Sequence, residues 1–223
     1  MTASTSSVIH LVTDRRQVSP EARTAAAELA GLERWFDAVV EAGVDVIQVR
    51  ERDLDAAVLS GLVRRLLLRT QGARCQVMVN DRADVALACG AEGAHLRADG
   101  PSVAEVRALG PEGWVVGRSV HQPAEVARHQ AADYLLFGTV FGSRSKAPAS
   151  PVAGLAALGT TAAKSTVPVV AIGGVTPATA ARCIAAGASG VAGIGVFLPE
   201  GSRDDAMGPV RAVAALREAM RGC

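Results

Sequence analysis

The feature of this chain that most constrains its fold is an eightfold alternation of short apolar segments with longer helical ones. The apolar segments are rich in Val, Ile and Ala, which is typical of parallel strands that are buried on both faces. The strands are expected at 9–13, 44–49, 76–79, 94–96, 114–119, 134–140, 169–172 and 191–196. The helices are expected at 32–42, 56–68, 83–89, 103–109, 123–129, 155–163, 178–186 and 206–220. Eight such units in 223 residues predict a single (βα)8 TIM barrel of the α/β class, with right-handed crossovers.

Composition and charge argue against several classes of protein. Apolar residues make up 49% of the chain but aromatic residues only 3%, so the core must be mostly aliphatic. A net charge of +1 gives little attraction to nucleic acid or to an anionic membrane, and no apolar segment is long enough to span a bilayer. We therefore expect no nucleic-acid partner and no membrane partner.

The chain is expected to be one domain with a short tail. Residues 1–7 are polar and lack the pattern of a signal peptide, so we predict a disordered tail there, a barrel domain over residues 8–223 and a cytoplasmic location. The four cysteines form no C-x-x-C pair and have no histidine at zinc-ligand spacing. This predicts neither a disulfide nor a zinc site.

Two apolar strands near the end of the chain finish in glycines. Glycine at a strand end lets backbone N–H groups approach a ligand closely, because no Cβ is in the way. Such turns at adjacent strand ends make a nest of amides for a phosphate group, and barrels often bind phosphate after their last two strands. We predict that a phosphorylated small molecule binds here. The expected phosphate-binding residues are Gly173, Gly174, Gly193, Ile194 and Gly195.

The second strand ends in polar side chains that alternate between two faces. Alternation directs Gln48, Arg50 and Arg52 to one side and Glu51 to the other. Two guanidinium groups and an amide at the barrel mouth would bind an anionic substrate. In the alternative interpretation, Arg50 forms an ion pair with Glu51 or another carboxylate and is structural.

The third strand ends in Asn80 and Asp81. A carboxylate and an amide at a strand end suit Mg²⁺ or a substrate that carries hydroxyl groups. Alternatively, Asp81 caps the helix that follows. Both interpretations use the same position, so the sequence leaves them open.

The fifth strand ends with a hydroxyl and an imidazole two residues apart, Ser119 and His121. His121 is the strongest candidate for a general acid–base, because imidazole titrates near neutral pH. Its alternative role is a helix cap next to Pro123. No carboxylate is placed to complete a triad, so Ser119 is not expected to be a nucleophile. His95, on the fourth strand, is expected to be a hydrogen-bonded core residue.

The one long loop, residues 141–153, follows the sixth strand and is rich in Ser, Pro and Gly. A polar loop at this end of a barrel is a candidate lid. Ser143, Ser145 and Lys146 would close over a phosphate or a diphosphate. The alternative is a passive surface loop.

Several motifs, in this order along the chain, resemble the thiamine phosphate synthase and TenI superfamily. They are Gln48-Val-Arg-Glu, Asn80-Asp-Arg-Ala-Asp-Val-Ala-Leu, Gly93-Ala-His-Leu, Ser119-Val-His, Lys146-Ala-Pro, Ala171-Ile-Gly-Gly-Val-Thr-Pro and Gly187-Ala-Ser-Gly-Val. The resemblance extends from about residue 9 to residue 197. It implies a (βα)8 barrel that serves thiamine biosynthesis, with two candidate activities.

Thiamine phosphate synthases join a pyrimidine diphosphate to a thiazole phosphate with Mg²⁺. By resemblance, Gly174, Ile194 and Gly195 would hold the thiazole phosphate, and Asp81 would bind Mg²⁺. The residues that would hold the pyrimidine diphosphate are Gln48, Arg50, Arg52, Asn80, Ser143, Ser145 and Lys146. TenI-type proteins instead aromatise a carboxylated thiazole phosphate by a proton shift without a metal. In that case, His121 would move the proton, and the glycine turns would hold the phosphate. Ser119 is also a predicted substrate-binding residue.

Departures from the synthase pattern concern the metal and the anion contacts. Synthases typically carry a second carboxylate for magnesium at the position where this chain has Gly100. Asp99 is the one neighbour that could replace it. Arg52 and Gly195 stand where synthases usually have Lys and Ser, and Gly117-Arg-Ser-Val-His121 resembles the tautomerase branch. Gln48 and Asp81 favour the synthase. We give most weight to the lost carboxylate, because a metal stabilises transition-state charge by several kcal/mol.

The prediction from sequence is therefore a thiazole tautomerase, an isomerase, with His121 as acid–base and no cofactor. Its expected partner is a phosphorylated thiazole, and a homodimer is compatible with it. The first alternative is thiamine phosphate synthase, a transferase that uses Mg²⁺. The second is a non-catalytic regulator that binds thiazole phosphate or thiamine phosphate.

Overall fold

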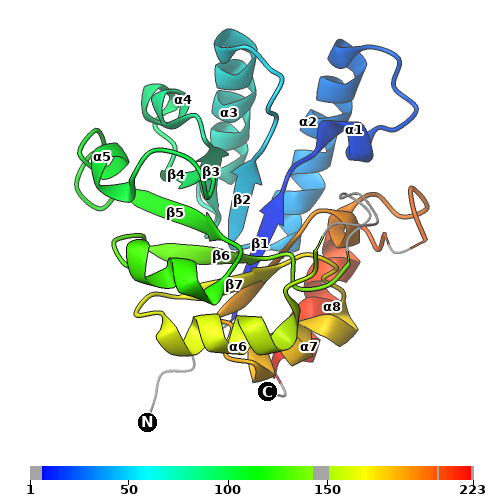
Figure 1. Ribbon diagram of the computed structural model, residues 1–223. Helices are drawn as coiled ribbons and strands as arrows, with labels where there is room; N and C mark the ends of the chain where they lie inside the picture. The colour runs from blue at the N-terminus through cyan, green and yellow to red at the C-terminus, as the bar shows by residue number, and fades with distance from the viewer. Residues whose placement is uncertain (1–6, 143–150, 205, 222–223) are drawn as a thin grey trace.

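The described residues, 7–142, 151–204 and 206–221 of a computed structural model, form a closed barrel of eight parallel strands in chain order (Figure 1). The strands are β1 (Val8–Val12), β2 (Val46–Val49), β3 (Gln76–Asn80), β4 (Gly93–Leu96), β5 (Val115–Val120), β6 (Tyr134–Gly138), β7 (Val169–Ile172) and β8 (Gly190–Gly193). The barrel closes because Leu11 of β1 lies opposite Ile47 of β2 on one side and Gly193 of β8 on the other. The predicted fold is confirmed. The predicted disordered tail lies outside the described residues, apart from Ser7.

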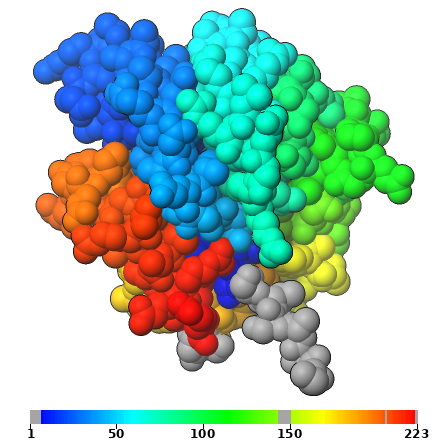
Figure 2. All heavy atoms as spheres, turned by 180° about the vertical axis from the view of Figure 1, so that it is seen from behind, coloured from blue at the N-terminus to red at the C-terminus, as the bar shows by residue number. Residues whose placement is uncertain are grey.

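Helices surround the strands and cover their outer faces. They are α1 (Arg15–Val18), α2 (Ala25–Ala42), α3 (Ala56–Thr70), α4 (Ala83–Cys89), α5 (Val103–Arg107), the 3₁₀ helix η1 (Pro123–Arg128), α6 (Gly154–Lys164), α7 (Pro177–Ala185), the 3₁₀ helix η2 (Gly195–Phe197) and α8 (Pro209–Arg221). Seen from behind, the blue and cyan atoms of α2 and α3 and the red atoms of α8 form one continuous outer surface (Figure 2). In the part of the chain that the structure describes, no helix combines the length and the apolarity needed to cross a membrane.

Helix α2 shows how the sequence sets an element. Its first turn begins where the Thr24 side chain accepts a hydrogen bond from the Ala27 N–H, and it ends at Gly43, whose φ is 77°. The face that packs on the barrel is buried at Leu32, Trp35, Phe36 and Val39. The expected start at Leu32 was too late, because the periodicity of large apolar residues begins there whereas the cap lies earlier.

Further elements differ from the expectation in type, in extent or in being unexpected, and among them β2, β6 and α5 are shorter than predicted. The predicted helix at 123–129 is the 3₁₀ helix η1. The predicted strand at 191–196 stops at Gly193, because Ile194 (φ −116°, ψ −62°) turns the backbone out of the extended conformation and into η2. The single turn α1 was not expected, since four residues capped by the Asp14 side chain are too few to show a period.

The interior of the barrel is not entirely aliphatic. His10, His95 and Tyr134 pack ring against ring between β1, β4 and β6, with centroids 5.5–6.4 Å apart. The pKa of His10 falls to about 4 because of burial, and burial, with smaller contributions from His10 and Arg118, lowers the pKa of His95 to about 3. Both imidazoles are therefore neutral at pH 7, and they form a polar layer inside the barrel.

Candidate active site

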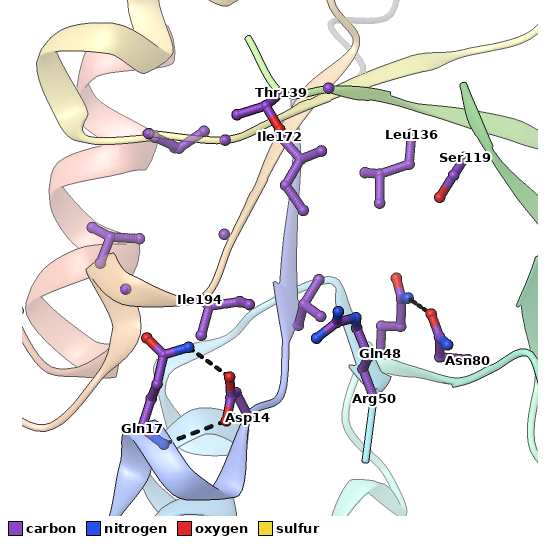
Figure 3. A pocket seen from close by; sticks show the side chains of 18 of the residues that line it. Asp14, Gln17, Gln48, Arg50, Asn80, Ser119, Leu136, Thr139, Ile172 and Ile194 are labelled. Atoms are coloured by element: carbon purple, nitrogen blue, oxygen red, sulfur yellow. Dashed lines mark hydrogen bonds between the residues drawn. The ribbon is translucent and has the colours of Figure 1, made fainter. Parts of the chain in front are cut away.

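A cavity of about 840 Å³ opens where the strands end. It is lined by residues from the carboxyl ends of β1, β2, β3, β5, β6, β7 and β8 and from the loops after them (Figure 3). This is the face on which barrels carry their active sites, because eight loops converge there on a rigid scaffold. The site residues predicted from the sequence, where the structure describes them, can therefore be compared with the lining of this one cavity.

The two glycine turns lie together on the cavity wall. All five predicted phosphate-binding positions are among the lining residues: Gly173, Gly174, Gly193, Ile194 and Gly195. Gly173 has φ 104° and Gly174 has φ 61°, and a Cβ on Gly174 would come within 2.6 Å of the Gly142 carbonyl oxygen. Within the described residues, the backbone N–H groups of Gly174 and Gly195 donate to no acceptor. The turn after β7 therefore requires glycine, and both turns leave amides available for an anion.

The end of β2 supplies cations to another part of the wall. Gln48, Arg50 and Arg52 all line the cavity, as the alternation predicted, and Gln48 Nε2 donates to Asn80 Oδ1 at 2.8 Å. Figure 3 shows the side chains of Gln48, Arg50 and Asn80 gathered on this wall. The Arg50 guanidinium has no acceptor among the described residues, and burial, followed by the charge of Arg52, lowers its pKa. A partly buried guanidinium without a partner can accept an anionic ligand.

The neighbouring carboxylate is used elsewhere. Glu51 is buried, accepts hydrogen bonds from Thr13 Oγ1 at 2.7 Å and Arg15 Nη1 at 3.0 Å, and has a pKa raised by burial. Arg15 also pairs with Asp53 at 2.6 Å, which holds the pKa of that carboxyl at about 2. The alternative in which Arg50 pairs with Glu51 is thus wrong, because the Glu51 carboxylate pairs with Arg15 instead.

Asp81 lies beside the cavity without being among its lining residues. Its φ is 60°, which is unusual for a residue with a Cβ, and its carboxylate accepts from the Asn80 amide at 3.0 Å and from the backbone N–H of Arg97 at 2.9 Å. Its Oδ2 also pairs with Arg97 Nε at 3.0 Å. The helix-cap alternative is wrong, because α4 begins after Arg82 without a side-chain cap.

The donor set around Asp81 does not fit a resident magnesium ion. Both carboxylate oxygens already accept N–H groups, position 100 is Gly, and the Asp99 side chain is 79% exposed and faces Arg97 at 3.5 Å. No cluster of three or more His, Cys, Asp or Glu suited to a metal occurs among residues 7–142, 151–204 and 206–221. Mg²⁺ prefers an octahedron of oxygen ligands, and the chain supplies a guanidinium at this place instead.

The end of β5 brings Ser119 and His121 to the cavity. Ser119 Oγ lies 2.8 Å from His95 Nε2, and His95 Nδ1 lies 3.0 Å from the Tyr134 hydroxyl, so His95 is the hydrogen-bonded core residue that the sequence predicted. The His121 ring is fixed by a hydrogen bond between Nδ1 and the Gly138 carbonyl. Gln122 rather than His121 is the cap residue of η1, so the capping alternative is wrong.

Three predicted substrate residues, Ser143, Ser145 and Lys146, lie outside the described residues. The ends of their loop are attached to the site, because Phe141 N–H donates to the Gly173 carbonyl at 3.1 Å and Ala153 N–H to the Thr139 carbonyl at 2.8 Å. Gly142 lines the cavity. Neither the lid nor the passive-loop interpretation is decided by these contacts.

Reasoning from the sequence did not identify several other residues that line the cavity. Arg97 is the most notable of them, and it lies two positions after His95, so the alternation used at β2 could have identified it. Asp14, Gln17 and Arg203 also line the cavity, and Arg203 Nη1 donates to Gln17 Oε1 at 2.8 Å. Contacts between residues so far apart in the chain leave no local signal.

The sequence comparisons with known proteins agree on one family. A family model described as "Thiamine monophosphate synthase" matches residues 10–197. A thiamine-phosphate synthase of Methanoculleus marisnigri is 43% identical over 71% of this chain and 76% of the relative, and one of Roseiflexus sp. is 36% identical over 93% and 85%. The structure of a thiamine phosphate pyrophosphorylase from Pyrococcus furiosus superimposes with a TM-score of 0.78 at 25% identity, and covers 96% of each chain.

These relatives overturn the predicted isomerase. They are named as synthases rather than as tautomerases, so the choice of the tautomerase branch was wrong. The acid–base role of His121 stays a prediction. The error came from the weight given to Gly100 as a lost carboxylate. The structure shows that Arg97, three residues before Gly100, forms an ion pair with Asp81.

Proposed function

This chain belongs to the thiamine monophosphate synthase family, and we propose that it is a thiamine-phosphate synthase. In this reaction, the C–O bond between the pyrimidine methylene group and its diphosphate breaks, and the electron pair stays on the diphosphate. The thiazole nitrogen then forms a C–N bond to the methylene carbon. The products are thiamine phosphate and diphosphate.

The observation that supports this proposal is that one cavity presents two separate groups of donors suited to anions. The cationic wall consists of side chains that follow β2 and β4, among them Arg50, Arg52 and Arg97. The amide turns are residues 173–174 after β7 and residues 193–195 after β8. In a closed barrel, β3 lies across from β7. A synthase must bind a diphosphate and a monophosphate at once. A cavity with these two regions suits that pair of substrates better than a single phosphate ester.

The residues of the cationic wall fit the leaving group. The Arg50 guanidinium, together with Arg52, would receive the negative charge that develops on the diphosphate, and such contacts strengthen as the bond breaks. Gln48 and Asn80, joined by their hydrogen bond, would orient the pyrimidine. Ser143, Ser145 and Lys146 remain proposed contacts of the diphosphate.

The amide turns fit the nucleophile. The Gly174 and Gly195 N–H groups would hold the thiazole phosphate and so direct the ring nitrogen toward the cationic wall. The reaction removes no proton from carbon, so His121 needs no acid–base role and serves as a polar part of the wall. A cytoplasmic location and a homodimer remain predictions that accompany this proposal.

The test is product identification. Purified protein is given hydroxymethylpyrimidine diphosphate and thiazole phosphate, with and without Mg²⁺, and the products are identified by mass spectrometry. We expect thiamine phosphate and inorganic diphosphate in equal amounts. In a separate reaction with carboxylated thiazole phosphate as the substrate, we expect no aromatisation above the background rate. Absence of thiamine phosphate under both conditions would contradict the proposal, and binding of both substrates without turnover would indicate a regulator.

A further inference from the structure

Arg97, the first residue of the loop that follows β4, is held in place mainly by Asp81, the first residue after β3. Its backbone N–H donates to Asp81 Oδ1 at 2.9 Å, and its side-chain Nε lies 3.0 Å from Asp81 Oδ2 and 3.5 Å from Asp99 Oδ1. Asp81 itself is fixed by Asn80 and by its own N–H, which donates to the His95 carbonyl at 2.9 Å. Arg97 is therefore anchored to one carboxylate at two points, by its backbone N–H and by the Nε at the inner end of its guanidinium.

The outer end of the same guanidinium is available. Arg97 lines the cavity, its side chain is 53% exposed, and its two terminal nitrogens have no acceptor in the described part of the chain. Arg50 and Arg52 line the same cavity. A guanidinium presents its N–H donors in a planar fork that matches phosphate oxygens, so this geometry suits a bound diphosphate.

We propose, resting on the function proposed above, that Arg97 supplies the positive charge at Asp81 that a protein-bound divalent cation would otherwise supply. Its terminal N–H groups donate to the diphosphate oxygens and stabilise the negative charge that collects there as the C–O bond breaks. No additional reactant is needed, since the electron pair leaves with the diphosphate. Asp81 acts as a positioning residue that holds the guanidinium toward the cavity.

A purely structural ion pair is the competing explanation. Such a pair would tie the loop after β4 to the loop after β3, and its loss would affect stability without affecting one substrate more than the other. An ion pair this exposed contributes little to stability, because solvent screens it. The two explanations therefore differ in what they predict for diphosphate binding.

The first test measures binding without turnover. Inorganic diphosphate is titrated by calorimetry into the wild-type protein and into Arg97→Gly, both in excess EDTA. We expect the dissociation constant to rise at least about tenfold in Arg97→Gly and less in Arg97→Lys, which keeps the charge but loses the fork. The matched control is Arg82→Gln, because Arg82 pairs with Asp84 at 2.6 Å and is not among the lining residues. An unchanged constant in Arg97→Gly would overturn the proposal.

The second test measures the dependence of turnover on metal. In excess EDTA, the wild-type protein and Arg82→Gln should keep at least about a tenth of their kcat with Mg²⁺, whereas Arg97→Gly should lose about 10²–10³-fold. Added Mg²⁺ should restore part of that loss, since it can accompany the diphosphate. A wild-type protein that is inactive in EDTA, with Arg97→Gly as active as wild type in Mg²⁺, would overturn the proposal. Absence of product under every condition would instead refute the proposed function.

Discussion

The two halves of the cavity offer hydrogen-bond donors of different kinds, an amide half along β7 and β8 and a cationic half along β2 and β4. In the amide half, along β7 and β8, the donors are backbone N–H groups, and at Gly173 and Gly174 a positive φ and close contacts leave no room for a Cβ. Along β2 and β4, the donors are long side chains, and the shape depends on how other groups hold them, as Asp81 holds Arg97. The difference teaches that the turn after β7 is intolerant of a side chain, whereas the donors along β2 and β4 depend on the groups that hold them.

The largest effect should come from the cationic half. Arg50→Gln removes a partly buried guanidinium without a protein partner, so we expect kcat/KM for the pyrimidine diphosphate to fall by about 10³-fold. KM for thiazole phosphate should change little, because the amide turns are untouched. Steady-state kinetics with each substrate varied in turn measures both. Equal losses for the two substrates would break the division of the cavity into halves.

A somewhat smaller effect is expected from the amide half. Gly174→Ala places a Cβ within 2.6 Å of the Gly142 carbonyl oxygen at φ 61°, so the turn must change shape. We expect KM for thiazole phosphate to rise about 100-fold, from strain and a displaced N–H donor.

The control for this variant is Gly90→Ala. Gly90 also has a positive φ, 74°, but a Cβ there meets nothing within 4 Å, and it lies at the end of α4 away from the cavity. It should cost stability by about 1 kcal/mol and leave both KM values unchanged. If Gly90→Ala raised KM as much as Gly174→Ala, the effect would be one of global stability.

A third prediction concerns the polar layer of the barrel interior. The folded-state pKa values of His10 and His95, about 4 and about 3, lie below the unfolded value of 6.5, so the native state binds fewer protons in acid. Stability is therefore present above pH 6.5 and is lost as the pH falls toward 4, by about 2 kcal/mol for each histidine between pH 7 and pH 5.

Urea unfolding at both pH values checks this prediction. The variant His10→Gln lacks one of the two groups, so its stability should fall about 2 kcal/mol less than that of the wild type between pH 7 and pH 5. Identical pH dependence in the two proteins would show that His10 is not neutral in the folded state.

The smallest effect is expected at His121. The proposed reaction removes no proton from carbon, so His121→Asn should reduce kcat less than about threefold, whereas loss of a general acid–base costs about 10²–10⁴-fold. The measurement is kcat at saturating concentrations of both substrates. A large loss would show that the cavity wall contributes proton transfer, and the synthase mechanism would have to be revised.

Local patterns predicted most of the fold and half of the site. Strand β7 and helix α4 were predicted at their observed bounds, because each is a periodic segment between clear stops. The alternation after β2 correctly grouped Gln48, Arg50 and Arg52. The role of the loop after β4 could not be predicted, because the Arg97–Asp81 pair joins residues 16 positions apart. Because Gly100 was considered without the Arg97–Asp81 pair, the predicted activity was that of the wrong enzyme.

The most direct test of the two-region cavity is a binding experiment with both anions. The protein is first saturated with inorganic diphosphate, and thiazole phosphate is then titrated by calorimetry. Two separate regions predict that one equivalent of thiazole phosphate binds with nearly unchanged affinity. Mutual exclusion of the two ligands would contradict the account.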